Sequence, residues 1–425
     1  MTRLAQDCFD HTGGLMRHDE VIALLQDRLA PVARLERLKL EQAAGRVLAE
    51  PVIAPRPIPA FDNAAMDGYG FAHASLNAGA ATELPVGAVV AAGHPLGRAL
   101  APGEAVRIFT GAEMPAGADS VVMQEMVEAE TRDGREFVTI PAGIRPGANR
   151  RRAGEYVAAG AAIAAAGTRL RPQDMAAIAS TGTGEITCYA PLRVALVSSG
   201  DEIIRPGAPF RDGAVYDANT YLLRAFLSQL PVTVTDLGIL PDRAEIVENA
   251  LAEAAAEHDL IMTSGGSSVG DEDHMTNAVT KLGRLNMWRL AIKPGKPLAF
   301  GRIGAAVFLG LPGNPVAAAV TYLMYARLLL ARLGGADWAA PRRLMLPSAF
   351  EIAARKTGRR EFLRGSRVTG PDGALAIDRY FRDGSGLISS LRESDGLIEL
   401  PEDLASVGKG DPIAFIPFSE LGMSF

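Results

Sequence analysis

The stretch TSGGSSVGDEDH, residues 263–274, combines residue types that can bind an anion and a cation together. Its glycines let the backbone approach a ligand closely, and backbone N–H groups in such a loop suit a phosphate or another oxyanion. The carboxylates that follow would repel this anion unless a divalent cation lay between them, and Mg²⁺ prefers oxygen ligands. We therefore predict a site for an anion and Mg²⁺. Its predicted substrate ligands are Ser264, Gly265, Gly266, Ser267, Ser268 and Gly270, and its predicted metal ligands are Asp271 and Asp273.

An ordinary turn between a strand and a helix is the alternative for this loop, because acidic residues are also favourable at a helix N-terminus. The loop is not a P-loop, since the Gly-Lys-Ser/Thr ending is missing. A second acidic loop, SSGDEI at 198–203, adds Asp201 and Glu202 as predicted ligands of the same cation. The alternative for these two is a glycine turn with solvated carboxylates.

Three further stretches carry residue types suited to an anionic ligand. AIKPGKPLAF, residues 291–300, holds Lys293 and Lys296 on a turn whose conformations the prolines restrict, which lowers the entropic cost of holding two ammonium groups toward one anion. A triple arginine contains Arg151, and arginine suits bidentate phosphate contacts. The third stretch is GLPGNPV, whose predicted ligand contacts are Pro312, Gly313, Asn314 and Pro315. The alternatives are solvated lysines for the first stretch, surface ion pairs for the arginines and a rigid helix cap for the third stretch.

The elements that must position these loops lie between residues 190 and 336. Apolar strand-like runs alternate with helical patterns there, which predicts a doubly wound, mostly parallel sheet. Ligands of such sheets bind beyond the carboxyl ends of the strands, and each loop of interest follows a strand at that end. The fold class we predict is therefore multidomain α/β, with the ligand site on one edge of the central sheet.

Composition changes along the chain predict the other domains. Residues 18–49 have a helical pattern, four prolines between residues 51 and 59 indicate a linker, and residues 168–185 predict a short helix that could pack back on the first. Short strand-like runs at 61–147 and after 340 predict β domains, the last a barrel or sandwich. The predicted domains are a discontinuous helical or mixed N-terminal domain (1–55 and 148–187), a small β-rich domain (56–147), the α/β domain (188–336) and a C-terminal β domain (337–425).

Composition also excludes several function classes. The net charge of -6 and the lack of a long basic stripe argue against nucleic-acid binding. Two cysteines, Cys8 and Cys188, cannot form a disulfide framework or a cysteine-based zinc site. A Ser-His-Asp nucleophile is not expected, because no G-x-S-x-G motif occurs. We find no run of 18 apolar residues and no secretory leader, so we expect no membrane segment and a cytoplasmic location.

Taken together, six motifs resemble the molybdopterin molybdenumtransferase family, which includes bacterial MoeA and the E domain of gephyrin. In chain order they are PAFDNAAMDGYGF, RIFTGAEMPAGADSVVMQE, SSGDEI, TSGGSSVGDEDH, AIKPGKPLAFG and LPGNPVAA. The resemblance implies an elongated subunit of four domains and a homodimer with its active site between protomers. It implies the last step of molybdenum cofactor assembly, in which the pyrophosphate of adenylated molybdopterin is cleaved with Mg²⁺ and molybdate as substrate, and AMP leaves.

The resemblance also implies individual site residues. The implied catalytic residues are Asp67, Thr110, Glu202, Asp242, Asp273, Lys293 and Lys296, and the further implied substrate contacts are Arg289, Pro312, Pro315 and Ser389 or Ser390. Tyr156 and His274 depart from the family, which often has Asp and Tyr at these positions. The Tyr156 change suggests a weaker or altered molybdate step. Two alternatives stay open: adenylyl transfer to molybdopterin with ATP, and a scaffold that binds molybdopterin without catalysis. A molybdopterin adenylyltransferase is a possible partner.

Overall fold

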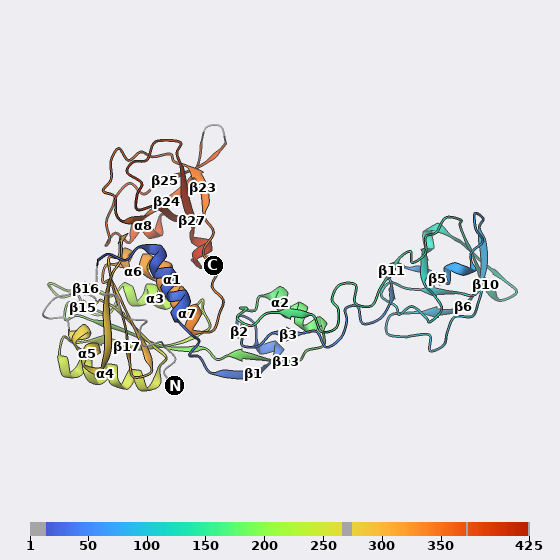
Figure 1. Ribbon diagram of the computed structural model, residues 1–425, viewed down its shortest axis with the longest axis horizontal. Helices are drawn as coiled ribbons and strands as arrows, with labels where there is room; N and C mark the ends of the chain where they lie inside the picture. Colours follow the sequence, from blue (N-terminus) through green and yellow to red (C-terminus); the bar gives the residue numbers. More distant parts are fainter. Residues whose placement is uncertain (1–13, 266–273, 371–372, 424–425) are drawn as a thin grey trace.

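The chain forms an elongated molecule with domains at both ends and a small domain between them (Figure 1). A computed structural model describes residues 14–265, 274–370 and 373–423. At one end the α/β domain lies against the C-terminal β domain, and both contact the N-terminal helix. At the other end lies the β-rich domain, which we call the distal domain. The middle domain joins the two ends through two extended stretches of chain.

The first helix is shorter than its sequence pattern predicts. α1 (His18–Arg28) ends before Pro31, and the chain then forms β1 (Leu35–Lys39), the 3-10 segment η2 (Leu40–Gln42) and β2 (Val47–Leu48). The prediction of helix over residues 18–49 was therefore wrong beyond Arg28, because proline cannot continue a helix and Gly45 has a positive φ of 75°. α1 packs its buried Val21 and Leu25 into the core of the α/β domain, not against the short helix of residues 168–185.

The middle domain is built from both sides of the distal domain in the sequence. β1 and β2 pair antiparallel with β13 (Glu185–Tyr189), and β3 (Val52–Ile53) pairs with β12 (Ala162–Ala164). α2 (Pro172–Ser180) begins with proline in its first turn and places Ile178 in a small core with Leu48 and Leu170. These pairings bring the two chain segments that flank the distal domain into one structural unit.

The distal domain contains a six-stranded sheet in the order β8-β5-β7-β6-β10-β9. A two-stranded pair, β4 with β11, lies where the chain enters and leaves this domain. The strands and short helical segments are β4 (Asn63–Ala64), β5 (Gly68–Phe71), η3 (His73–Ser75), β6 (Thr82–Val90), β7 (Ala105–Ile108), β8 (Ser120–Met123), η4 (Gln124–Met126), β9 (Glu128–Arg132), β10 (Arg135–Ile140) and β11 (Arg150–Arg151).

The α/β domain has a mixed six-stranded sheet in the order β17-β14-β18-β22-β21-β19. The first four strands are parallel to one another, whereas β21 runs antiparallel to both of its neighbours, β22 and β19. The strands are β14 (Leu192–Ser199), β17 (Val232–Leu240), β18 (Leu260–Ser264), β19 (Gly283–Arg289), β21 (Pro297–Ile303) and β22 (Ala306–Leu311), with a small parallel pair of β15 (Ile203–Ile204) and β16 (Val215–Tyr216) beside them.

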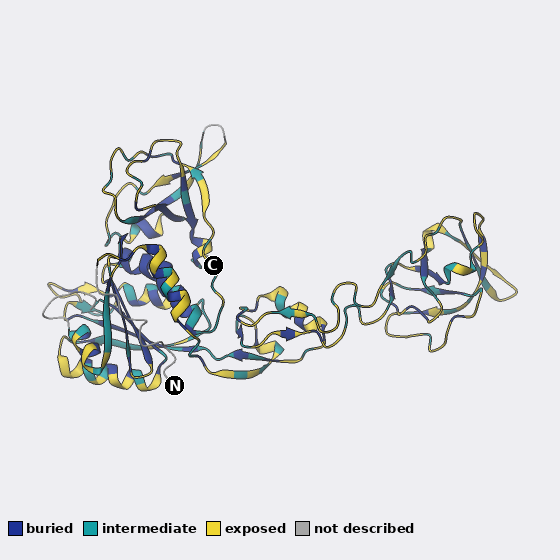
Figure 2. Ribbon diagram, in the orientation of Figure 1, coloured by how far each residue is buried: buried dark blue, intermediate teal, exposed yellow. Residues whose placement is uncertain are grey.

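Helices cover both faces of this sheet, so its strands are largely buried (Figure 2). One layer contains α3 (Asn219–Leu227), α6 (Pro315–Thr321), the π-helical segment η5 (Tyr322–Ala326) and α7 (Arg327–Leu333), together with α1. The other contains α4 (Ala244–Glu257) and α5 (His274–Leu282). The continuous helix Pro315–Leu333 is long and apolar enough to cross a membrane by composition alone, but 83% of that stretch is buried inside the protein. Its apolar character therefore matches its place in the core.

The C-terminal domain shares its sheet with the α/β domain. The strand order is β20-β24-β26-β27-β23, and β20 (Ile292–Lys293) comes from the α/β domain. β25 pairs with β24 at the side. The other elements are β23 (Leu344–Pro347), β24 (Arg360–Thr369), β25 (Leu375–Arg379), α8 (Ser389–Arg392), β26 (Gly396–Leu400), β27 (Pro412–Pro417) and η6 (Phe418–Leu421).

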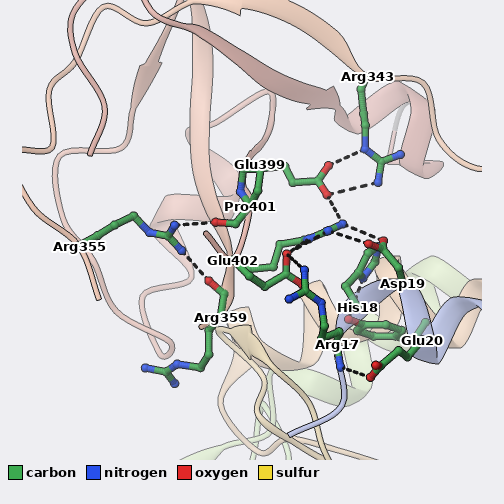
Figure 3. A network of polar contacts seen from close by, with 12 residues as sticks. Arg17, His18, Asp19, Glu20, Arg343, Arg355, Arg359, Glu399, Pro401 and Glu402 are labelled. Carbon is green, nitrogen blue, oxygen red and sulfur yellow. Dashed lines mark hydrogen bonds and ion pairs between the residues drawn. The ribbon is translucent and has the colours of Figure 1, made fainter. Parts of the chain in front are cut away.

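A network of ion pairs connects α1 to the C-terminal domain (Figure 3). The Arg360 guanidinium contacts three carboxylates: Asp19 on α1 at 3.0 Å, Glu399 on β26 at 3.0 Å and Glu402 at 3.0 Å. Arg343 pairs with Glu399 at 2.5 Å. Because Arg360, Glu399 and Glu402 are buried, each of these charges depends on its partners. Asp19 is 71% exposed and adds a surface ion pair that connects α1 to them.

His18 lies next to this network and is 3% exposed. Its Nδ1 is 2.9 Å from the Tyr325 hydroxyl, and its ring meets the rings of Tyr325 and Phe362 edge-on. Burial, and next the Arg360 charge, lower the pKa of His18 from 6.5 to about 4, against the opposing effects of Glu399 and Asp19. The imidazole is therefore neutral in the folded protein at neutral pH.

Mild acid should consequently weaken the folded state through His18. The unfolded chain takes up a proton on this residue near pH 6.5, whereas the folded chain excludes it until about pH 4. The stabilisation is fully present above pH 6.5 and is lost as the pH falls, by about 2 kcal/mol between pH 7 and pH 5. In urea unfolding, H18Q should lose less stability over this range than the wild-type protein. Equal losses in the two proteins would contradict this account.

Candidate functional site

The carboxyl ends of β14, β18 and β22 meet at one edge of the α/β sheet, where the chain leaves each strand in a loop. A cavity of about 430 Å³ lies at this edge. The backbone of Gly265 reaches it from β18 with a φ of 92°, and its N–H donates to the Leu311 carbonyl of β22 at 3.1 Å. Six predicted site residues line this cavity: Glu202, Ser264, Gly265, Gly313, Asn314 and Pro315.

Two lining residues that we did not predict hold these loops together. The Asn219 side-chain amide donates to Ser264 Oγ at 2.7 Å and to the Gly313 carbonyl at 2.6 Å, so it connects two neighbouring strand ends. The buried Asp217 carboxylate accepts hydrogen bonds from the Ser198 hydroxyl at 2.9 Å and the Thr220 hydroxyl at 2.8 Å. Asp217 and Asn219 stand at the start of α3, directly after β16, and no motif in the sequence analysis included them.

A second and larger cavity, of about 870 Å³, lies between the α/β domain and the C-terminal domain. It shares Gly313 and Asn314 with the first cavity, so the two adjoin. Its lining includes five cationic side chains and one carboxylate: Arg289, Lys293, Lys296, Arg359, Arg364 and Asp383. This excess of positive charge suits a ligand with several negative charges, such as a phosphate ester.

The lysine turn is positioned by both domains. Lys293 lies on β20, which pairs in parallel with β24, and Lys296 precedes β21. Between them Gly295 has a φ of 100°, and a Cβ there would come within 2.4 Å of Thr321 Oγ1 on α6. Only glycine fits this close approach of the turn to the helix. The two lysine side chains are both exposed, and both line the larger cavity.

Arg359 and Arg364 come from the C-terminal domain and were not predicted from the sequence. The Arg364 side chain is 4% exposed and donates to Ser390 Oγ at 3.1 Å and to the Phe362 carbonyl at 3.1 Å. Burial lowers the pKa of Arg364 from its usual value, and the charge of Asp383 opposes this effect. Because Ser390 is buried beneath Arg364, it supports this arginine and does not line the cavity, which Ser385 does.

Other predicted residues lie around these cavities or away from them. Asp201 and Asp242 each accept a hydrogen bond from the other's backbone N–H at 3.2 Å, beside the cavity edge. Ser389 accepts a hydrogen bond from the Tyr380 hydroxyl at 3.3 Å. Pro312 lines the larger cavity, and Arg151 lies on β11 at the base of the distal domain. Six predicted ligands lie outside the described residues: Gly266, Ser267, Ser268, Gly270, Asp271 and Asp273.

The predicted Mg²⁺ site depends largely on those residues. Within the described ranges, no group of three or more His, Cys, Asp or Glu side chains could hold a metal ion. Asp201 and Glu202 are the predicted ligands that the structure describes, and two carboxylates do not make up a cation site alone. The Mg²⁺ assignment therefore stays a prediction.

Asp67 and Thr110 form a separate polar site in the distal domain. Asp67 Oδ1 accepts hydrogen bonds from the Thr110 backbone N–H and from its hydroxyl, both at 2.7 Å. These two hydrogen bonds, the hydroxyl first, lower the pKa of Asp67, and the Arg107 charge adds to the effect. Within one chain this site lies at the far end of the molecule from the two cavities (Figure 1).

Fold and site together define a class: a multidomain α/β protein with a polar cavity at the carboxyl edge of its sheet and an adjoining cationic cavity between two domains. Comparisons with known proteins narrow this class. Residues 16–182 match the MoeA N-terminal region (domains I and II), residues 195–332 match a probable molybdopterin binding domain, and residues 349–418 match the MoeA C-terminal region (domain IV).

Relatives match over nearly the whole chain. The molybdopterin molybdenumtransferase of Haemophilus influenzae is 36% identical over 404 residues, which cover 95% of this chain and 98% of that protein. That of Nostoc sp. is 36% identical over 307 residues, which cover 71% of this chain and 70% of that protein. The crystal structure of the molybdopterin biosynthesis MoeA protein from Pyrococcus horikoshii matches with a TM-score of 0.79 at 27% identity, over 95% of this chain and all 100% of that one.

The chain therefore belongs to the molybdopterin molybdenumtransferase family, a family of enzymes of molybdenum cofactor biosynthesis.

The Asp67–Thr110 contact can be tested without an activity assay. T110V removes the hydroxyl hydrogen bond and keeps the backbone one, so the pKa of Asp67 should rise toward the ordinary carboxyl value while staying below it. The midpoint can be read by NMR from the ¹³C signal of the side-chain carboxyl, assigned with D67N. An unchanged midpoint in T110V would show that the hydroxyl does not bind the carboxylate in solution.

Proposed function

We propose that the two adjoining cavities bind adenylated molybdopterin, and that the enzyme cleaves its pyrophosphate, inserts molybdate and releases AMP. The observation that carries this proposal is the joined pair of cavities. One is lined by backbone, hydroxyl and amide groups of the strand ends, and the other by five cationic side chains. A ligand with a polar organic part and a bridging pyrophosphate has complementary groups for both.

The side chains support this chemistry mainly by neutralising charge and fixing positions. Pyrophosphate cleavage requires no covalent protein nucleophile, and cations held around the phosphorus centre stabilise the negative charge that develops there. Lys293 and Lys296 reach the cavity from one rigid turn, and Arg364 is held from behind by Ser390. Mg²⁺, when bound, would add further charge neutralisation. Molybdate is itself an oxyanion and suits the same cationic lining.

We propose further that the working enzyme is a homodimer in which the distal domain of one subunit completes the cavity of the other. In one chain Asp67 and Thr110 are too distant to contribute, although the motif that contains Asp67 is one of the six that carry the family resemblance. Two large apolar side chains of the motif that contains Asp67 are exposed in the single chain, Phe61 at 42% and Met66 at 46%. Tyr156, on the adjoining loop, is 60% exposed. A surface of this kind favours contact with another protein surface.

The purified protein, given adenylated molybdopterin, Mg²⁺ and molybdate, should release AMP in a reaction that depends on molybdate. K296M should lower the rate by about 10²-fold or more, because it removes a cation that faces the cleaved pyrophosphate. The assay also separates the alternatives. ATP consumption with molybdopterin would support adenylyl transfer, and binding without turnover would support a scaffold. Excess chelator tests the Mg²⁺ prediction. A cytoplasmic location and a partner adenylyltransferase stay predictions.

Mixing two inactive variants tests the shared site. D67N disables only the distal-domain half and K296M only the cavity half, so a mixed dimer keeps one intact site. After random exchange of subunits, activity should recover to about a quarter of the wild-type value. Recovery should require conditions that let dimers exchange, as followed by size-exclusion chromatography. If the mixture stays inactive although mixed dimers form, each site is built from a single chain.

A further inference from the structure

One carboxylate among the groups around the larger cavity has no role in the chemistry described so far. Glu361 Oε2 accepts a hydrogen bond from Lys293 Nζ at 3.2 Å. The side chain of Glu361 is 12% exposed and that of Lys293 is 46% exposed, so the acid is buried while the lysine reaches the cavity. The backbones of the two residues lie opposite each other in the parallel pairing of β20 with β24. The contact is therefore built into the sheet.

Glu361 is itself held from behind. Its other oxygen, Oε1, forms an ion pair with Arg355 Nε at 3.5 Å, and the Arg355 side chain is 5% exposed. The Arg355 guanidinium donates to the backbone carbonyls of Pro401 at 2.6 Å and Arg359 at 2.5 Å (Figure 3), and also to that of Leu404. A buried arginine that is fixed by three carbonyls thus lies at ion-pair distance from the carboxylate that contacts Lys293, without a hydrogen bond to it.

A carboxylate at this place is costly for simple anion binding. It neutralises part of the charge of Lys293 and competes with any anionic ligand for the ammonium group. What it supplies in return is position, because a lysine side chain has four rotatable bonds and much conformational entropy. Rates of group transfer depend strongly on position, since a shift of about 1 Å in a reacting group can lower a rate about 10²-fold.

We propose that Glu361, oriented by Arg355, is a positioning residue that holds the Lys293 ammonium group at one point of the cavity wall for the reaction. This inference rests on the proposed function, since the reaction is pyrophosphate cleavage in that cavity. It makes two predictions of opposite sign. Without the carboxylate, a phosphate ligand meets less competition for Lys293, whereas the chemical step loses a fixed cation.

E361Q tests this with little change of shape. Its kcat for molybdate-dependent AMP release should fall about tenfold to a hundredfold. Its affinity for inorganic pyrophosphate, measured by calorimetry, should rise by about threefold. The lysine end of the ion pair is half-exposed, so the pair is weak, and its loss frees the ammonium group for the ligand. R355M should also lower kcat, because the Glu361 carboxylate would no longer be held in its orientation. A merely structural role would instead lower kcat and weaken pyrophosphate binding together.

A double-mutant cycle tests whether Glu361 acts through Lys293. In a K293M background E361Q should leave both kcat and the pyrophosphate affinity unchanged, since the group that it positions is gone. Pyrophosphate binding can be measured even where K293M turns over too slowly, so this half of the cycle is always available. An effect of E361Q of equal size with and without Lys293 would overturn the proposal, as would an unchanged kcat in E361Q.

D259N is the matched control. Asp259 is 15% exposed and pairs with Arg193 at 2.8 Å, at the amino-terminal edge of the same central sheet, away from the cavities. D259N should lower the midpoint of thermal unfolding. It should not produce the opposite changes of kcat and pyrophosphate affinity that are expected of E361Q. If the wild-type protein released no AMP, the proposed reaction would fail, while coupling between Glu361 and Lys293 in pyrophosphate binding would still be measurable. Absence of that coupling overturns the inference alone.

Discussion

The parallel pairing of two short stretches, β20 with β24, holds the α/β domain to the C-terminal domain, and the larger cavity depends on it. On one side of this pair the chain turns through Gly295 and presents Lys293 and Lys296. On the other side the strand β24 presents Arg364. Neither domain alone supplies the full set of cations. Because like charges repel, this cationic wall requires a rigid backbone behind it, and the shared sheet provides one.

The N-terminal helix stabilises this arrangement from behind. α1 packs its apolar face into the core of the α/β domain and brings Asp19 to Arg360, the residue next to Glu361 on β24. Buried ion pairs contribute little net stability, since desolvation offsets most of the attraction, but they penalise any geometry in which a charge loses its partner. The buried pairs of Arg360 with Glu399 and Glu402 therefore fix the geometry within the C-terminal domain. Asp19, which is 71% exposed, links α1 to them through a surface ion pair.

Local patterns predicted the four parallel strands of the central sheet, but not its two further strands, β21 and β19, which join by antiparallel pairing. Continuous apolar runs that alternate with helical segments indicate a sheet whose two faces are both buried. Glycine, proline and serine after such runs mark the ends of the strands. Local patterns failed where a distant contact decided the outcome. Residues 35–39 became a strand of the middle domain because β13, about 150 positions later, pairs with them. Arg359 and Arg364 had no local signature either, since arginines in a β domain are usually solvated.

The sequence by itself determined which chemistry was available: serine and glycine loops for an anion, a lysine pair on a turn restricted by prolines, and carboxylates near both. Residue type and spacing carry that information because they set charge, backbone freedom and hydrogen-bonding capacity within a few positions of the chain. Only the tertiary structure decided which of these groups meet. It joined the lysine turn to Glu361, set Asn219 across two strand ends, and placed Asp67 in a distant domain. Those outcomes follow from contacts between segments that are far apart in sequence. The free energy of such contacts depends on both segments, so no short stretch of sequence predicts it.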